Sequence, residues 1–264
     1  MNRSGMDEKF YEVAGPGSLA ERLAILARNR IYNDFLCICR PQPEETILDV
    51  GVSDVTGNLA NFLERSYPFP SRITAVGIGA GHRFQEAFPT VRYRQIAANE
   101  PLPFADASFD IATSNAVLEH VGSRENQRRF VAELMRVGRR VFLTVPSRYF
   151  LIEQHTSIPL LHWTGYTFAL TCRILGKQDW SRPENLILMS PRALRVACPA
   201  EAGVQIGMTG IPLGPWSSNL YLFGSIWPTP EGVHLRRARS EGRVSGEASR
   251  STAHCRGLAL SVCA

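Results

Sequence analysis

Two short segments carry side chains that could move protons or bind a cation. Glu119 and His120 are neighbours in the run Asn115-Ala-Val-Leu-Glu-His-Val121, and Glu153 and His155 stand two residues apart later in the chain. Histidine titrates near neutral pH, so it is the natural general base. His120, His155 and Glu153 are therefore the candidate catalytic residues. The alternatives are hydrogen-bonded packing for His155 and an orienting role beside His120 for Glu119.

A second candidate site lies in Ile47-Leu-Asp-Val-Gly-Val-Ser-Asp54, where an apolar run ends at a glycine. A glycine directly after a buried strand lets the backbone approach a ligand closely. The acid Asp49 at the strand end can meet a cationic or hydrogen-bonding group of that ligand. The alternative is a tight turn in which Asp54 caps the following helix.

These residues need a scaffold, and short apolar runs predict one. Strands are expected at residues 46–50, 73–78, 91–96, 109–113 and 140–145, with helices between them and a possible closing pair at 204–211 and 219–223. Strands that alternate with helices favour an α/β fold, a parallel doubly wound sheet with helices on both faces. Ligands of such sheets bind at the carboxyl ends of the strands, which is where both candidate segments stand.

Composition changes along the chain suggest its organisation. A helical extension is expected over residues 1–43, opened by the capping box Ser18-Leu-Ala-Glu21. The main domain is expected over residues 44–228, with an aromatic-rich, lid-like insertion at 147–190. The Arg- and Ser-rich tail at 229–264 has little apolar content and is predicted to be disordered.

The overall composition excludes several classes of protein. The chain has 264 residues, 44% hydrophobic and 20% charged, and a net charge of +5, of which the six Arg and three Glu after residue 230 supply +3. The remaining charge is too small for a nucleic-acid groove, so no nucleic-acid partner is expected. No apolar run is long enough to cross a membrane and the N-terminus is polar, which predicts a cytoplasmic protein. The tail leaves peripheral membrane contact open.

The six cysteines do not predict a metal site. They stand at positions 37, 39, 172, 198, 255 and 263, without a Cys-x-x-Cys pair. This spacing is typical of reduced, mostly buried thiols. We therefore expect no metal.

The runs "ILDVG", "LPFADASFD", "LEHV" and "RRVFLTVPSR" resemble the class I S-adenosylmethionine-dependent methyltransferases, in particular the branch of ubiquinone and menaquinone biosynthesis. The resemblance covers Thr46 to Arg148. It implies a Rossmann-like sheet of seven strands, the last antiparallel, with S-adenosyl-L-methionine across the ends of strands one, two and four. Asp49 and Gly51 would hold the methionine portion of this cofactor. Asn115 would line its reactive end, beside Glu119 and His120.

The sequence departs from that family at four cofactor positions. Ser53 and Val55 replace two glycines of the first loop, Gly77 replaces the acid that binds the ribose, and Ala98 replaces the Asp that contacts adenine. Ser53, Gly77 and Ala98 are still the matching candidate cofactor positions. Losing one charged hydrogen bond typically costs ~1.5–3 kcal/mol of binding.

The resulting functional hypothesis is methyl transfer to a small, lipid-like or glycan-precursor-like acceptor. One alternative is a non-catalytic methyltransferase-like module in a biosynthetic complex, which Gly77 and Ala98 favour. A second is a nicotinamide-dependent oxidoreductase, suggested by the glycines at 77, 79 and 81. The dinucleotide pattern needs its third glycine at the position of His82 and belongs after the first strand.

Overall fold

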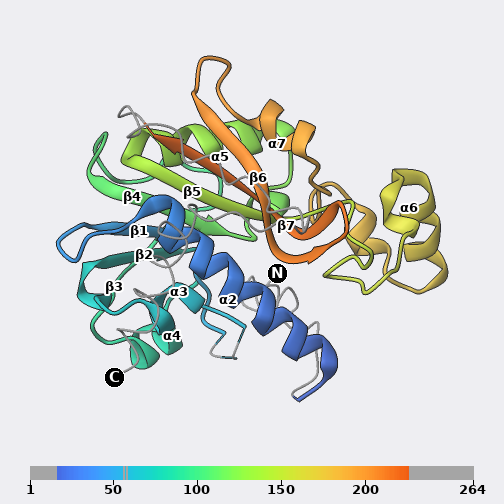
Figure 1. The fold of residues 1–264 in the computed structure, drawn as a ribbon, viewed down its shortest axis with the longest axis horizontal. Helices are drawn as coiled ribbons and strands as arrows, with labels where there is room; N and C mark the ends of the chain where they lie inside the picture. Colours follow the sequence, from blue (N-terminus) through green and yellow to red (C-terminus); the bar gives the residue numbers. More distant parts are fainter. Residues whose placement is uncertain (1–16, 56, 58, 226–264) are drawn as a thin grey trace, which may run out of the picture. The chain divides into compact units, whose positions relative to one another are not determined.

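The computed structural model describes residues 17–55, 57 and 59–225 (Figure 1). The predicted tail at 229–264 lies outside these residues. The strands are β1 (Ile47–Val50), β2 (Ile73–Gly77), β3 (Arg92–Gln95), β4 (Phe109–Asn115), β5 (Gly138–Pro146), β6 (Val204–Leu213) and β7 (Trp216–Ser225). The helices are α2 (Leu19–Cys39), α3 (Phe62–Ser66), α4 (His82–Ala87), α5 (Arg124–Val137), α6 (Gly165–Ile174) and α7 (Pro191–Ala197), with 3-10 turns η1 (Pro70–Arg72), η2 (Leu118–His120), η3 (Leu161–Trp163) and η4 (Gln178–Ser181).

The strands form one seven-stranded sheet in the order β3-β2-β1-β4-β5-β7-β6. β1 to β5 are parallel to one another, and β7 is antiparallel to both β5 and β6. This confirms the predicted fold class. The strand order reverses between β1 and β4, so a ligand crevice is expected above the carboxyl ends of these two strands.

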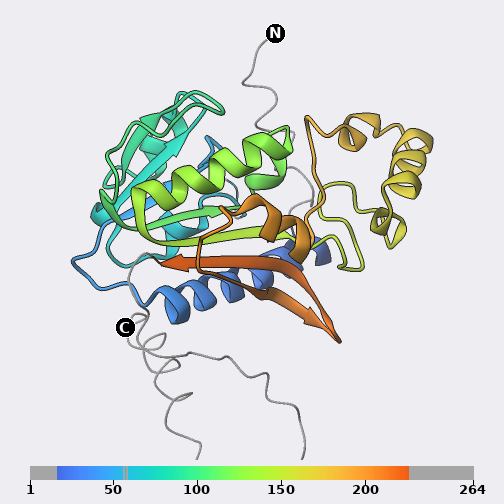
Figure 2. The same ribbon diagram turned by 90° about the horizontal axis from the view of Figure 1, so that it is seen from above.

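Alternating side chains of the strands divide the core into two layers. Leu48 and Leu143 face the cluster that contains α5 and α7, whereas Ile47 and Phe142 face the cluster that contains α2 and α4. Successive residues of a strand point to opposite faces, and both faces of this sheet are covered by helices (Figures 1 and 2). The near-continuous apolar runs in the sequence follow from this double burial.

Helix α2 begins where the capping box predicts. The Ser18 side chain accepts a hydrogen bond from the Glu21 backbone N–H at 3.1 Å. The helix packs Ile31 and Phe35 against the sheet. It is joined to β6 by a hydrogen bond of 2.6 Å, which the Thr209 hydroxyl donates to the Asp34 carboxylate. Among the described residues, no helix combines the length and hydropathy that crossing a bilayer requires.

The segment 147–190 follows β5 and builds a small core of its own. Ile158, Phe168, Cys172 and Leu186 are buried together, with Trp180 packed against them. The Arg148 guanidinium donates to the backbone oxygen of Trp163 at 3.0 Å, so it binds its own segment. Figure 2 shows α6 set to one side of the helices that cover the sheet.

Candidate active site

A cavity of about 1790 Å³ lies at the carboxyl ends of the parallel strands. Ligand pockets usually measure roughly 300–1,000 Å³, so this one has room for two molecules. It is lined by the loops after β1, β2, β4 and β5 and by one side of α2. The predicted site residues that line it are Asp49, Gly51, Gly77, Ala98, Asn115, His120, Glu153 and His155. Ser53 is buried in its loop and is absent from the lining.

Gly51 is required by the turn after β1. Its φ is +104°, and a Cβ there would lie 2.3 Å from Val117 Cγ2. Its backbone N–H donates to the Val76 carbonyl at 2.8 Å, which ties the turn to β2. Because Gly51 has no side chain, the backbone of the turn forms part of the cavity wall. The sequence predicts such a close approach of the backbone at this glycine.

A pair of carboxyl groups, one from β1 and one from α3, lies close to this turn. Asp49 lines the cavity, and Glu64 of α3 is buried against it, 4% exposed. Burial raises the pKa of Asp49 to about 7, and burial together with the Asp49 charge raises that of Glu64. The two groups can share a proton, or they can face a cation. The sequence does not predict Glu64 as a site residue, because an acid between apolar residues of a helix is usually expected to face solvent.

The side-chain amide of Asn61 holds the loop after β1 in place. Asn61, at φ 51°, accepts from the Ser53 backbone N–H at 3.0 Å and donates to the Ser53 carbonyl at 2.7 Å. The Ser53 hydroxyl accepts from the Val55 N–H at 3.1 Å. Ser53 thus shapes the loop from within, and the residues to either side of it, Val52 and Asp54, reach the cavity.

The end of β2 has no space for the acid that the resemblance expects. A Cβ at Gly77 would lie 2.4 Å from the Val52 carbonyl oxygen and 3.1 Å from Tyr93 Oη. Asp54 cannot substitute for that acid, because its carboxylate accepts from the backbone N–H groups of Gly81 and Phe84 at 3.0 and 3.2 Å. Ala98 is exposed at the cavity rim.

Replacing Gly81 by alanine is expected to lower the unfolding free energy by about 3 kcal/mol. Its φ is +74°, and a Cβ would lie 2.1 Å from Tyr93 Cε1, so conformational strain and overpacking add. Gly176→Ala is the matched control, with a φ of +68° and nothing within 4 Å; its expected loss is about 1 kcal/mol. Chemical denaturation measures both. Equal losses would show that the Tyr93 contact does not matter.

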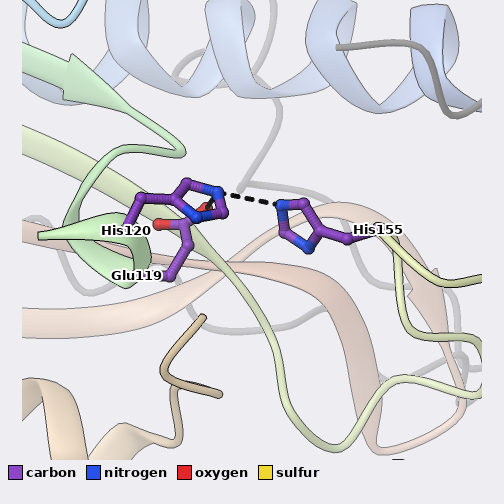
Figure 3. A group of neighbouring side chains, drawn as sticks. All are labelled: Glu119, His120 and His155. Carbon is purple, nitrogen blue, oxygen red and sulfur yellow. Dashed lines mark hydrogen bonds and ion pairs between the residues drawn. The ribbon is translucent and has the colours of Figure 1, made fainter. Parts of the chain in front are cut away.

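Two histidines that are 35 residues apart in the sequence meet at the cavity wall (Figure 3). Their Nε2 atoms are 3.1 Å apart. His120 Nδ1 lies 2.7 Å from the Asn185 carbonyl oxygen, and His155 Nδ1 lies 2.7 Å from Glu153 Oε1. The neighbouring Glu119 is 1% exposed. The sequence predicts these residues as site residues but cannot show that they touch.

Their electrostatic environments differ. Burial and the nearby His155 lower the pKa of His120 to about 3. The hydrogen bond and charge of Glu153 raise the pKa of His155 against the effect of burial, and that partnership lowers the pKa of Glu153 to about 2. Burial raises the pKa of Glu119 to about 7. His162, the other histidine of the insertion, is fully buried in η3 and does not line the cavity.

Asn115 ends β4 rather than following it. The strand runs two residues past its predicted end because Ser114 and Asn115 still pair with Leu143 and Thr144 of β5. The Thr144 hydroxyl donates to Asn115 Oδ1 at 2.5 Å. Since no described residue accepts a hydrogen bond from its Nδ2, the amide can donate into the cavity.

Known proteins resemble this chain in sequence over one domain and in fold over most of the described residues. Residues 48–140 match the family model described as a methyltransferase domain. The magnesium protoporphyrin IX methyltransferase of Synechocystis PCC 6803, solved with bound SAH, is 13% identical, with a TM-score of 0.51 over 84% of this chain and 94% of its own. The PH0226 protein of Pyrococcus horikoshii is 10% identical, with a TM-score of 0.51 over 82% and 94%. No curated protein matches the chain.

The structural likeness extends well beyond the matched domain, and at these identities it shows a shared fold. Both solved chains are covered almost completely, including the region after β5 that the family model leaves out. The residues that differ from the family's motifs, at positions 53, 77 and 98, do not disturb the architecture.

Proposed function

We propose that this chain, whose residues 48–140 match a methyltransferase domain, is an S-adenosylmethionine-dependent methyltransferase that acts on a small, largely apolar acceptor. One observation carries the proposal. Asp49 lines a large cavity beside the backbone of Gly51, and the buried carboxyl group of Glu64 lies next to Asp49.

The residues present fit the cationic end of that cofactor. S-adenosylmethionine supplies a methyl group bound to a positively charged sulfur, and its methionine part carries an ammonium group. A cation that binds next to a buried carboxylate stabilises its ionised form. Asp49 would hold the ammonium end with Glu64 behind it, Gly51 would admit the chain by its lack of a side chain, and the Asn115 amide would donate at the reactive end.

Other residues of the cavity lining fit an apolar acceptor. Leu23, Ala27 and Ile31 of α2 line the cavity, as do Phe150 and Ile152 of the insertion. Leu23 and Ile152 are 42% and 48% exposed, so part of each apolar side chain is open to contact with a molecule in the cavity. In the transfer, the acceptor atom forms a bond to the methyl carbon as the carbon–sulfur bond breaks, and an acceptor proton leaves to solvent. The walls align the two reactants.

The experiment is calorimetry of the full chain with S-adenosylhomocysteine and S-adenosylmethionine. Saturable micromolar binding is expected. Asp49→Asn should lower the affinity for S-adenosylmethionine by about 10–150-fold, which corresponds to the loss of one charged hydrogen bond. Glu125→Gln, which removes an exposed carboxylate on α5, is the control and should bind normally. An absence of heat at millimolar ligand would contradict the proposal.

The missing anchors at Gly77 and Ala98 favour a second candidate, a methyltransferase-like module without catalysis. The same calorimetry separates the two. A module of this kind would bind neither form of the cofactor. An enzyme binds both forms and transfers the methyl group.

A further inference from the structure

We infer that Glu119, His120 and His155 form a binding site for a divalent transition-metal cation of the zinc type. One ring nitrogen from each histidine and a carboxylate oxygen lie within 4.8 Å of one another. His120 and Glu119 come from η2 after β4, and His155 comes from the loop after β5 (Figure 3). The site departs from the expectation of no metal, which rested on the cysteines.

The hydrogen bonds at the far side of each ring determine what can lie between the rings. The partner of His120 Nδ1 is a backbone carbonyl oxygen, and the partner of His155 Nδ1 is a carboxylate. Both partners only accept, so each ring must place a proton on its Nδ1. In a neutral ring this leaves Nε2 with a bare lone pair. Two bare lone pairs 3.1 Å apart repel unless a cation lies between them, and that cation is a proton or a metal ion.

The spacing fits a metal ion. Zinc binds histidine nitrogen at roughly 2.0–2.1 Å, which places two nitrogen ligands about 3.3 Å apart in a tetrahedral site. The observed 3.1 Å is close to this value. A proton would also satisfy the pair of nitrogens, but it would leave the third member of the cluster unexplained.

That third member is Glu119. Its side chain is 1% exposed, and neither carboxylate oxygen has a hydrogen-bond partner among the described residues. Oε1 lies 3.9 Å from His120 Nε2. A buried carboxylate without donors is costly unless a cation compensates it. A divalent ion carries a charge of +2, which the two carboxylates of Glu119 and Glu153 would neutralise.

The supporting residues are those that metal sites use. Metal-bound histidines almost always donate their other N–H to a carboxylate or a carbonyl oxygen, as His155 does to Glu153 and His120 to Asn185. Trp180 packs against the His155 ring, 5.1 Å between centroids, and restricts its rotation. Since His120 and His155 line the cavity, the fourth position of the ion faces it.

This arrangement of three protein ligands and one open position is that of a catalytic rather than a structural site. The open position takes water or an oxygen atom of a molecule in the cavity. If the proposed function holds, that oxygen belongs to the acceptor. His120 and His155 then position the acceptor through the metal, in place of acting as bases.

The test uses the full chain stripped of metal with a chelator. Zinc is titrated in competition with a chromophoric chelator, and cobalt is added separately to read its visible absorption. One equivalent of zinc should bind, the melting temperature should rise with zinc concentration, and cobalt should give the intense bands of a four-coordinate ion. A wild-type chain that binds no zinc at micromolar free metal, or gives only the pale spectrum of hydrated cobalt, overturns the inference without any variant.

Variants then assign the ligands. His120→Ala, His155→Ala and Glu119→Gln should each weaken zinc by more than the roughly 10–100-fold expected for Glu153→Gln, which alters only a supporting residue. His82→Ala, an exposed histidine at the cavity rim, should leave affinity unchanged. Zinc binding that survives the ligand variants contradicts the site. Calorimetry with S-adenosylhomocysteine on the metal-free chain tests the proposed function separately. A chain that binds this ligand but no zinc contradicts only the metal site, and a chain that binds zinc but not this ligand contradicts only the proposed function.

Discussion

Gly51→Ala is expected to lower the unfolding free energy by about 4 kcal/mol and the melting temperature by about 10 °C. A backbone at φ +104° strains any residue with a Cβ, by roughly 1–3 kcal/mol. The new methyl group would also lie 2.3 Å from Val117 Cγ2, and overpacking costs a further ~1–3 kcal/mol. Thermal and chemical denaturation measure the loss.

The same change should weaken S-adenosylhomocysteine about 10–100-fold, because the turn must move away from the cavity wall and lose one or two hydrogen bonds to the ligand. Val117→Ala in the Gly51→Ala background removes the clash but not the strain, so it should recover part of the stability. Gly57→Ala, whose Cβ would touch only Val55 at 3.9 Å, is the control. Wild-type stability and affinity in Gly51→Ala would contradict our reading of the turn.

Raising the pH from 4 to 9 is expected to destabilise the protein through Asp49 and Glu64. Folding raises the pKa of Asp49 from 3.8 to about 7, so the folded chain keeps a proton that the unfolded chain releases. The stabilising effect is complete below about pH 4 and is lost as the pH rises through 7. The loss from Asp49 is at most about 4 kcal/mol. Glu64, whose pKa is raised further, extends the loss to higher pH.

Among the described residues, the charged group that acts on each of these carboxyl groups is the other one. Glu64→Gln removes one of them and supplies an amide donor to Asp49. Urea denaturation across this pH range should therefore show a shallower slope, and at pH 8 the variant should be about 1–3 kcal/mol more stable than wild type. Glu125→Gln should follow the wild-type curve. A Glu64→Gln protein less stable than wild type at pH 8 would count against the buried pair.

Much of the fold can be predicted because its sequence signals are local. The run from Ile47 to Val50 predicts a buried strand, and the capping box at Ser18 predicts a helix start that the structure confirms by the side-chain cap to the Glu21 N–H. The seven-stranded sheet with its antiparallel last strand is confirmed as well. These features depend on burial period and capping chemistry, which neighbouring residues determine.

The site is less predictable because it depends on contacts distant in sequence. Sequence alone cannot show that Glu64 lies behind Asp49, or that the Val52 carbonyl fills the space beside Gly77. The contact of His120 with His155 depends on how the insertion folds back after β5. In each case the residue type suggests chemistry, and only the tertiary structure determines the partner.

The hydrogen bond between Asp34 and Thr209 joins residues 175 positions apart. Helix α2 supplies a wall of the cavity, yet the strand that anchors it is among the last parts of the described chain to be synthesised. During synthesis, α2 can pack Ile31 and Phe35 against the earlier strands, but its hydrogen bond to β6 forms only after most of the described chain has emerged. A nascent chain that stops short of β6 would have β1 and its turn but would lack the strand that fixes α2, so we expect the α2 side of the cavity to be completed late in synthesis.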